Sequence, residues 1–97
     1  MKIKWLRTAL KNLDQALDHI AKDDRQAAVR ILHRVQATVE LLNTHPALGR
    51  PGRVAETREL VISGTPFVIP YRIKEETVEI LRVFHGAQDY PKDISSK

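Results

Sequence analysis

The sequence predicts a small α+β domain in which a short strand, two helices and three further strands follow one another along 97 residues. Three patterns predict this class. Apolar and polar residues alternate near the N-terminus, apolar residues recur at helical spacing from about 8 to 44, and alternation returns from 58 to 85. Because the connections are short, we expect an antiparallel helical hairpin packed on a three-stranded antiparallel meander, within a single domain over residues 1–97.

The first expected element is a strand over residues 2–6. Ile3 and Trp5 would lie on one face of this strand, and Lys2 and Lys4 on the other. We expect it to join the sheet of the meander, antiparallel to its neighbour.

Two amphipathic helices are expected next. The first covers residues 8–22, with Thr8 as its N-cap. Asp23 and Gln26 stand three residues apart, as in a capping box, and they predict the start of the second helix. That helix must end before Pro46, because the residue that precedes a proline avoids helical backbone angles. So short a link predicts that the helices pack antiparallel.

The remaining chain predicts a loop and then the meander. Residues 45–53 contain two prolines and two glycines, which indicate a loop. Strands are expected over residues 58–63, 66–74 and 77–85. On the second of these, one apolar face is predicted, formed by Phe67, Ile69, Tyr71 and Ile73. Pro70 cannot donate a ladder hydrogen bond and predicts an edge position or a local bulge. The last strand is apolar on both faces, which indicates a central position.

Positive charge is concentrated in one part of the chain. The net charge is +4, and residues 25–53 hold five arginines against the single acidic residue Glu40. Such a field attracts nucleic acid or an acidic protein partner, but it is equally typical of a solubilising surface.

Several classes of site are excluded or disfavoured by composition. The absence of cysteine excludes disulfides, thiol nucleophiles and cysteine-based zinc sites, and it fits a cytoplasmic protein. The histidines lack the spacing of metal ligands, and no phosphate-binding glycine loop is present, so we expect neither metal nor cofactor. We expect no signal peptide and no membrane partner, because no apolar run is long enough to cross a bilayer.

A few polar side chains on the predicted sheet could carry chemistry. Arg58, Arg72 and Arg82 could each hold a phosphate, or could pair with a carboxylate such as Glu59 or Glu79.

Two further residues are candidates near the C-terminus. His85, at the end of the last strand, could act as a general acid or base, or could simply bond to a backbone carbonyl. Tyr90 could stack on a base or cover the edge of the core.

The expected loop carries two further candidates. Arg50 and Arg53 could bind an anion, or could be ordinary loop charges.

A series of short motifs, in this order and at this chain length, resembles the RelE/ParE toxin superfamily. The motifs are Leu48-Gly49-Arg50-Pro51-Gly52-Arg53, Thr57-Arg58-Glu59-Leu60-Val61, Tyr71-Arg72-Ile73, Ile80-Leu81-Arg82-Val83-Phe84-His85 and the ending His-Gly-Ala-Gln-Asp-Tyr-Pro. The resemblance covers nearly the whole chain. It implies a growth-inhibiting toxin of a type II toxin–antitoxin system, with a role in plasmid stabilisation and a cognate antitoxin that binds it in a hetero-oligomer.

The resemblance leaves two branches open. RelE-like members cleave mRNA on the ribosome without a metal, whereas ParE-like members poison DNA gyrase. RelE-like nucleases usually carry an arginine three residues before the strand tyrosine, and Val68 stands there before Tyr71. The long hairpin also resembles ParE-like toxins, so the ParE-like branch is favoured.

Each branch implies its own set of site residues. Under the RelE-like alternative, the catalytic residues would be His85, Arg58, Arg72 and Tyr90. An antitoxin or target would be bound by four arginines, namely Arg50, Arg53, Arg58 and Arg82. A third hypothesis is a toxin-like fold that has lost its activity and serves only as a binding module.

Overall fold

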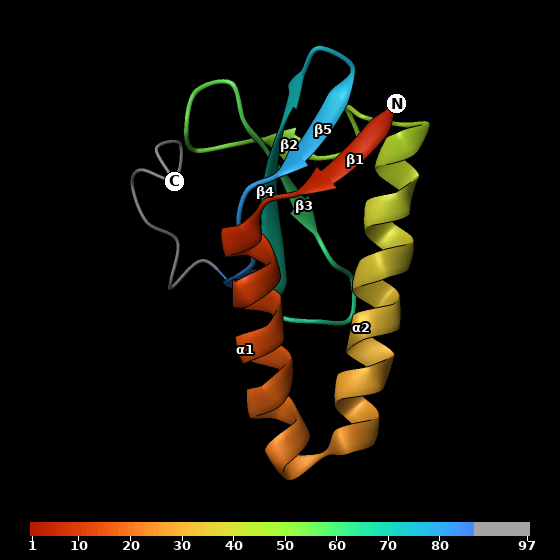
Figure 1. Cartoon of the computed structure of the whole chain (residues 1–97), viewed down its shortest axis with the longest axis vertical. Helices are drawn as coiled ribbons and strands as arrows, with labels where there is room; N and C mark the ends of the chain where they lie inside the picture. The colour runs from red at the N-terminus through yellow and green to blue at the C-terminus, as the bar shows by residue number, and fades with distance from the viewer. Residues whose placement is uncertain (87–97) are drawn as a thin grey trace.

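The computed structural model describes residues 1–86 of the chain. Its elements, in order, are β1 (Lys2–Trp5), α1 (Arg7–Asp23), α2 (Arg25–Glu40), the 3-10 helix η1 (Leu41–Asn43), β2 (Arg50–Pro51), β3 (Arg58–Val61), β4 (Phe67–Lys74), β5 (Thr77–Ile80) and β6 (Phe84–His85). Figure 1 shows the two helices as an antiparallel hairpin that extends beyond the sheet. The predicted α+β class is confirmed.

One mixed sheet joins all of the strands. The strand order is β1-β5-β4-β3-β2, and β6 pairs separately with β4. The core lies between this sheet and the helices. It consists of Ala9, Leu13, Val35, Val39, Leu42, Leu60, Ile62, Phe67, Ile69, Tyr71, Val78, Ile80 and Val83. Full burial of one large apolar side chain contributes about 1.5–3 kcal/mol, so this shared layer holds the helices on the sheet.

The prediction that the first strand runs antiparallel to its neighbour is wrong. β1 pairs with β5 in parallel, with Ile3 opposite Val78. The helical hairpin explains the direction, because η1 contacts β1 and the chain therefore returns to the end of the sheet where β1 starts (Figure 1). β3 then runs in the same direction as β1, β4 reverses, and β5 again runs alongside β1.

The helix ends differ from their predicted positions by one residue. α1 begins at Arg7, and Thr8 is not its N-cap. Instead, Leu6, whose side chain cannot form a hydrogen bond, occupies the N-cap; its N–H donates to the carbonyl of Ile80 at 3.0 Å and its own carbonyl accepts from the Leu10 N–H. At the next boundary, Asp24 rather than Asp23 caps α2, through a 3.0 Å bond from the Ala27 N–H.

Replacing Asp24 with alanine is expected to lower the free energy of unfolding by about 1 kcal/mol, because the N-cap bond is lost. Asp23→Ala is the matched control, since Asp23 is the last residue of α1 and makes no N-cap bond. Urea unfolding of both variants measures the difference. An Asp23→Ala variant as unstable as the Asp24→Ala variant would contradict the observed cap.

The loop and the strands of the meander also differ in detail from expectation. Within the expected loop 45–53, β2 pairs with β3, placing Arg50 opposite Glu59. β3 ends at Val61, two residues earlier than expected. Ile73, predicted on the buried face, is 43% exposed, because the β4–β5 hairpin reaches past the helices (Figure 1).

Pro70 lies in a central strand, so the expected edge position is wrong, but a bulge stands beside it. Tyr71 pairs with Ile80 and Val68 pairs with Phe84, so two residues of β4 face the three residues 81–83. The Leu81 N–H donates to the Pro70 carbonyl at 3.0 Å. Because the nitrogen and carbonyl of one strand residue point toward the same neighbour, the proline nitrogen also faces residues 81–83. The bulge interrupts the expected strand 77–85 where proline cannot donate.

Within residues 1–86, none of the helices is long and apolar enough to cross a membrane.

Candidate functional site

A buried carboxylate organises the arginine-bearing loop of residues 46–53, called here the arginine loop. Glu59 on β3 is only 2% exposed. Its Oε1 accepts from Arg50 Nε and Nη2, at 3.1 and 2.9 Å. Its Oε2 accepts from the Arg53 backbone N–H at 3.1 Å and lies 3.5 Å from Arg53 Nε. One carboxylate therefore holds both arginines of the loop.

A second anchor of the arginine loop is the phenol of Tyr71. Tyr71 on β4 is fully buried, and its hydroxyl donates to the Pro46 carbonyl at 2.7 Å and accepts from the Gly49 N–H at 2.8 Å. Burial raises the pKa of Tyr71 above its usual value of 10.0, against smaller opposing effects of the Gly49 hydrogen bond and the Arg58 charge. The phenol therefore stays protonated at neutral pH and can donate to Pro46.

Gly49 allows this close contact between loop and sheet. A Cβ at Gly49 would lie 2.6 Å from Tyr71 Cε1 and 2.9 Å from the Glu59 carbonyl oxygen. Arg58 Nη1 adds bonds to the Ala47 and Gly49 carbonyls, at 3.3 and 2.8 Å. The arginine loop is thus held by side chains from three positions on β3 and β4.

Arg72 and Glu79 form a separate pair on β4 and β5. Arg72 Nε lies 2.6 Å from Glu79 Oε1, and the side chains are 34% and 15% exposed. The hydrogen bond from Arg72 holds the pKa of Glu79 below its usual value of 4.5, with burial acting in the opposite direction. Pairing with a carboxylate, one of the two interpretations of Arg72, is confirmed.

The lowered pKa of Glu79 predicts a small acid sensitivity. Because the folded pKa is depressed, the pair stabilises the fold above the usual pKa of 4.5, and this contribution is lost as the pH falls through the folded value. Since both side chains are partly exposed, we expect less than about 1 kcal/mol. Unfolding of Glu79→Gln and wild type between neutral and acidic pH measures it. A difference that grows on acidification would contradict the prediction.

Arg82 lies in the bulge and is almost inaccessible. It is 8% exposed, and its Nη1 donates to the Leu81 carbonyl at 2.8 Å. Its expected role in binding an antitoxin or target stays a prediction, and a partner could reach little of it in this conformation. Arg50 and Arg53 are more accessible, with side chains 54% and 43% exposed despite their bonds to Glu59.

Of the four residues expected to form a nuclease site, the three that the structure describes do not come together. His85 is exposed and pairs with Phe67, whose ring it meets edge-on at 6.0 Å between centroids. Arg72 lies five residues farther along β4, and Arg58 pairs with Tyr71, four residues from Phe67. At about 3.4 Å per strand residue, these positions are roughly 17 and 14 Å along the sheet from the residue that pairs with His85. Tyr90 lies outside the described residues.

The sequence did not predict that Glu59 and Tyr71 anchor the arginine loop. The available signal was the Glu59 carboxylate directly before the apolar run 60–62 of the expected strand. Its long-range partners follow from the β2–β3 register, which places Arg50 opposite it. Among residues 1–86, no cluster of three or more potential metal-binding side chains is found.

Comparison with known proteins extends this description. Residues 3–90 match the family described as the ParE toxin of the type II toxin–antitoxin system parDE. The chain is 46% identical over 91 residues to the protein Y4kP of Sinorhizobium fredii, which is named as a candidate toxin, and the match covers 94% of each. It is 32% identical over 87 residues to toxin RelE2 of Caulobacter vibrioides, covering 90% of this chain and 97% of that one.

A solved structure resembles the fold closely. A chain of the chromosomal ParDE toxin–antitoxin system from P. aeruginosa matches with a TM-score of 0.81 and 29% sequence identity. The match covers 89% of this chain and 96% of the other.

Proposed function

This chain belongs to the ParE toxin family of type II toxin–antitoxin systems, and from that premise we propose that it inhibits DNA gyrase and is neutralised by a cognate antitoxin. The observation that supports this proposal is that His85, Arg58 and Arg72, three of the four side chains expected to cleave RNA, are spread along the sheet. Metal-free RNA cleavage needs a base, an acid and a cation around one phosphate. An inhibitor that acts by binding another enzyme needs only a surface, and it would act in the cytoplasm, where gyrase works.

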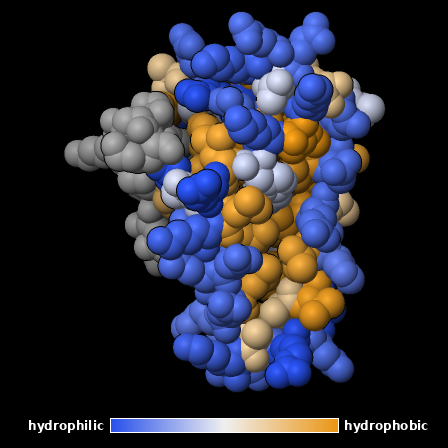
Figure 2. Space-filling view, in the orientation of Figure 1, coloured by the Kyte–Doolittle hydropathy of each residue, from blue (hydrophilic) through white to orange (hydrophobic). Residues whose placement is uncertain are grey.

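The apolar side of the helical hairpin supports binding of an antitoxin. Figure 2 shows an apolar band that runs between α1 and α2. Partly buried side chains packed against the core are Ile3, Trp5, Ala16, Leu17, Ile20, Ile31 and Leu32. We propose that an apolar segment of the antitoxin covers this band, and that its acidic residues approach the arginine loop.

A gyrase assay tests the proposed activity. Purified protein is added to gyrase and relaxed plasmid with ATP, and supercoiled and linear DNA are quantified with and without the antitoxin. We expect loss of supercoiling and accumulation of linear DNA released from gyrase by denaturation, both prevented by the antitoxin. Unchanged supercoiling with no linear DNA, from protein that stops growth when expressed without its antitoxin, would exclude gyrase as the target.

The contribution of the arginine loop to antitoxin binding is tested separately. Replacing Arg50, Arg53 and Arg58 with glutamine is expected to weaken binding, most strongly at low salt, because charge complementarity is lost. Glu59→Gln is the control, since it loosens the same loop while keeping the three cations. Antitoxin affinity unchanged in the triple variant would exclude the electrostatic contribution.

The RelE-like alternative is kept because one relative is named RelE2 and because His85 is exposed. It predicts cut mRNA in purified translating ribosomes, with cleavage reduced in a His85→Ala variant. Cleavage at the full rate in that variant would exclude His85 as the acid or base. Expression without antitoxin that leaves growth normal would favour the inactive binding module.

A further inference from the structure

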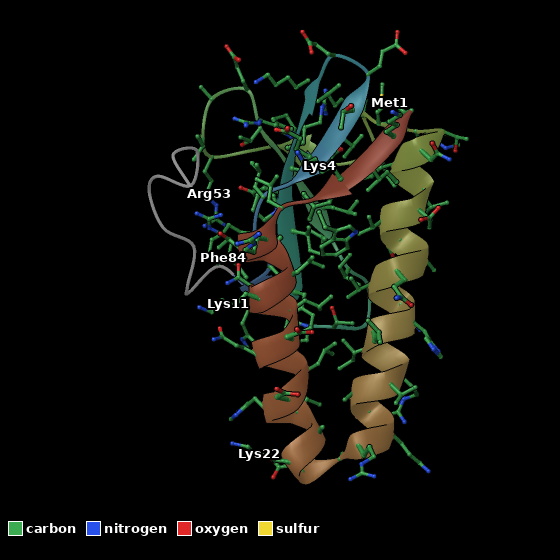
Figure 3. The ribbon with its side chains drawn as sticks, viewed as in Figure 1. Met1, Lys4, Lys11, Lys22, Arg53 and Phe84 are labelled. Atoms are coloured by element: carbon green, nitrogen blue, oxygen red, sulfur yellow. The ribbon has the colours of Figure 1, made fainter. Side chains whose placement is uncertain are left out.

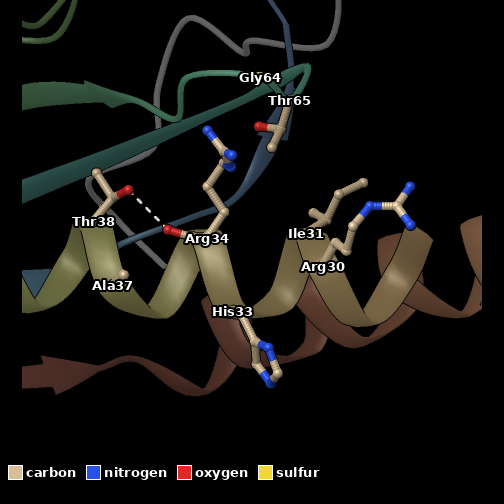
Figure 4. A pocket seen from close by; sticks show the side chains of 8 residues that line it. All are labelled: Arg30, Ile31, His33, Arg34, Ala37, Thr38, Gly64 and Thr65. Atoms are coloured by element: carbon tan, nitrogen blue, oxygen red, sulfur yellow. Dashed lines mark hydrogen bonds between the residues drawn. The ribbon is translucent and has the colours of Figure 1, made fainter. Parts of the chain in front are cut away.

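A groove separates α2 from the turn between β3 and β4. Its volume is about 670 Å³, and it is lined by Arg30, Ile31, His33, Arg34, Ala37, Thr38, Gly64 and Thr65. Figure 4 shows that the side chain of Arg34 points toward this turn, that the side chain of Arg30, one helical turn earlier, extends along α2 away from it, and that the ring of His33 points away. The groove is distinct from the arginine loop.

Among the described residues, the two arginines of this groove form no ion pair. Within the described part of the chain, no carboxylate lies within ion-pair distance of Arg30 or Arg34. Arg34 Nη1 donates to the Ser63 carbonyl at 3.2 Å, which directs its guanidinium toward the turn. Gly64 leaves room for it, because a Cβ there would lie 3.1 Å from Arg34 Nη1. The groove therefore presents one guanidinium oriented by the turn and a second, from Arg30, along its lining.

We propose that this groove binds the phosphodiester backbone of nucleic acid through Arg30 and Arg34. Guanidinium groups bind phosphate oxygens with paired N–H donors, and the backbone supplies such groups at regular intervals. The N–H groups of Arg34 beyond Nη1 make no other bond within residues 1–86, so they are available to a phosphate.

The composition of the groove favours a phosphate backbone over an acidic peptide. Its apolar lining is limited to the side chains of Ile31 and Ala37, the latter on the exposed side of α2. A peptide interface usually has a central apolar or aromatic anchor in a desolvated pocket, whereas contacts to a phosphate backbone are made by cations and other polar groups. The groove offers the second type of surface.

Fluorescence anisotropy with a short labelled DNA duplex tests the proposal directly on the purified toxin. We expect binding by the wild type that weakens with salt, and at least tenfold weaker binding by the R30Q/R34Q variant at low salt. Each lost phosphate contact should lower the slope of log affinity against log salt by about 0.9. The control K11Q/K22Q removes the same charge from exposed positions on α1 (Figure 3).

Each outcome decides for or against the groove. Equal losses in the two double variants would show a general effect of net charge and overturn the proposal. So would a wild type that binds a polyglutamate peptide but not DNA. Because Arg34 contacts Ser63, the single variant R30Q, which breaks no bond within the described residues, must also weaken binding. The assay contains no gyrase, so its failure is distinguishable from failure of the proposed function.

Discussion

Replacing Glu59 with glutamine is expected to lower the free energy of unfolding by about 2–3 kcal/mol, more than any other single charge-removing change in the sheet. The carboxylate is buried and holds the side chains of Arg50 and Arg53 as well as the Arg53 backbone N–H. Glutamine keeps the size of the side chain but offers one acceptor oxygen and no charge. The two guanidinium groups then repel each other without compensation.

Glu79→Gln is the matched control for Glu59→Gln. It makes the same chemical change in a pair whose members are both partly exposed, and we expect it to cost less than about 1 kcal/mol. Urea unfolding at neutral pH measures both variants, and proteolysis within residues 46–53 reports whether the loop is released. Equal stabilities of the two variants would mean that Glu59 does not anchor the arginine loop.

Tyr71→Phe is expected to cost about 2 kcal/mol while keeping the aromatic ring in the core. The substitution removes the acceptor of the Gly49 N–H and the donor to the Pro46 carbonyl. Gly49 is buried, so its N–H loses a partner that water cannot easily replace. The arginine loop should detach locally before the domain unfolds, and faster hydrogen exchange at Gly49 would report this.

The raised pKa of Tyr71 supplies a second readout of the same anchor. Because the folded pKa is higher than the unfolded value, the neutral phenol stabilises the fold below about pH 10, and this contribution is lost as the pH rises through the folded value. The wild type should therefore lose stability in strong base more steeply than Tyr71→Phe. Parallel pH profiles of the two proteins would contradict a buried, hydrogen-bonded phenol.

The elements that depend on local pattern could be predicted from the sequence. Helical periodicity in residues 8–44 reports which side of each helix is buried, and Asp24 lies only one residue from the predicted cap Asp23. Pro70 predicted a bulge, because the missing N–H is a property of the residue itself. The direction of β1 could not be obtained in this way, since it depends on where the helical hairpin returns the chain.

The candidate site could be predicted only in part, for a related reason. Arg50, Arg53, Arg58 and Arg72 were identified by residue type, but their partners depend on strand register. A shift in the register between β2 and β3 would move Glu59 away from Arg50. Likewise, the separation of His85 from Arg72 depends on register, because β6 pairs with the start of β4 whereas Arg72 pairs with Glu79 on β5.

Direct binding to purified gyrase, compared with binding to ribosomes, tests most closely the claim that this ParE-family chain acts on gyrase. Labelled toxin is titrated with each, with the antitoxin as competitor. We predict saturable binding to gyrase that the antitoxin abolishes, and no comparable binding to ribosomes. Saturable binding to ribosomes with none to gyrase would contradict the account.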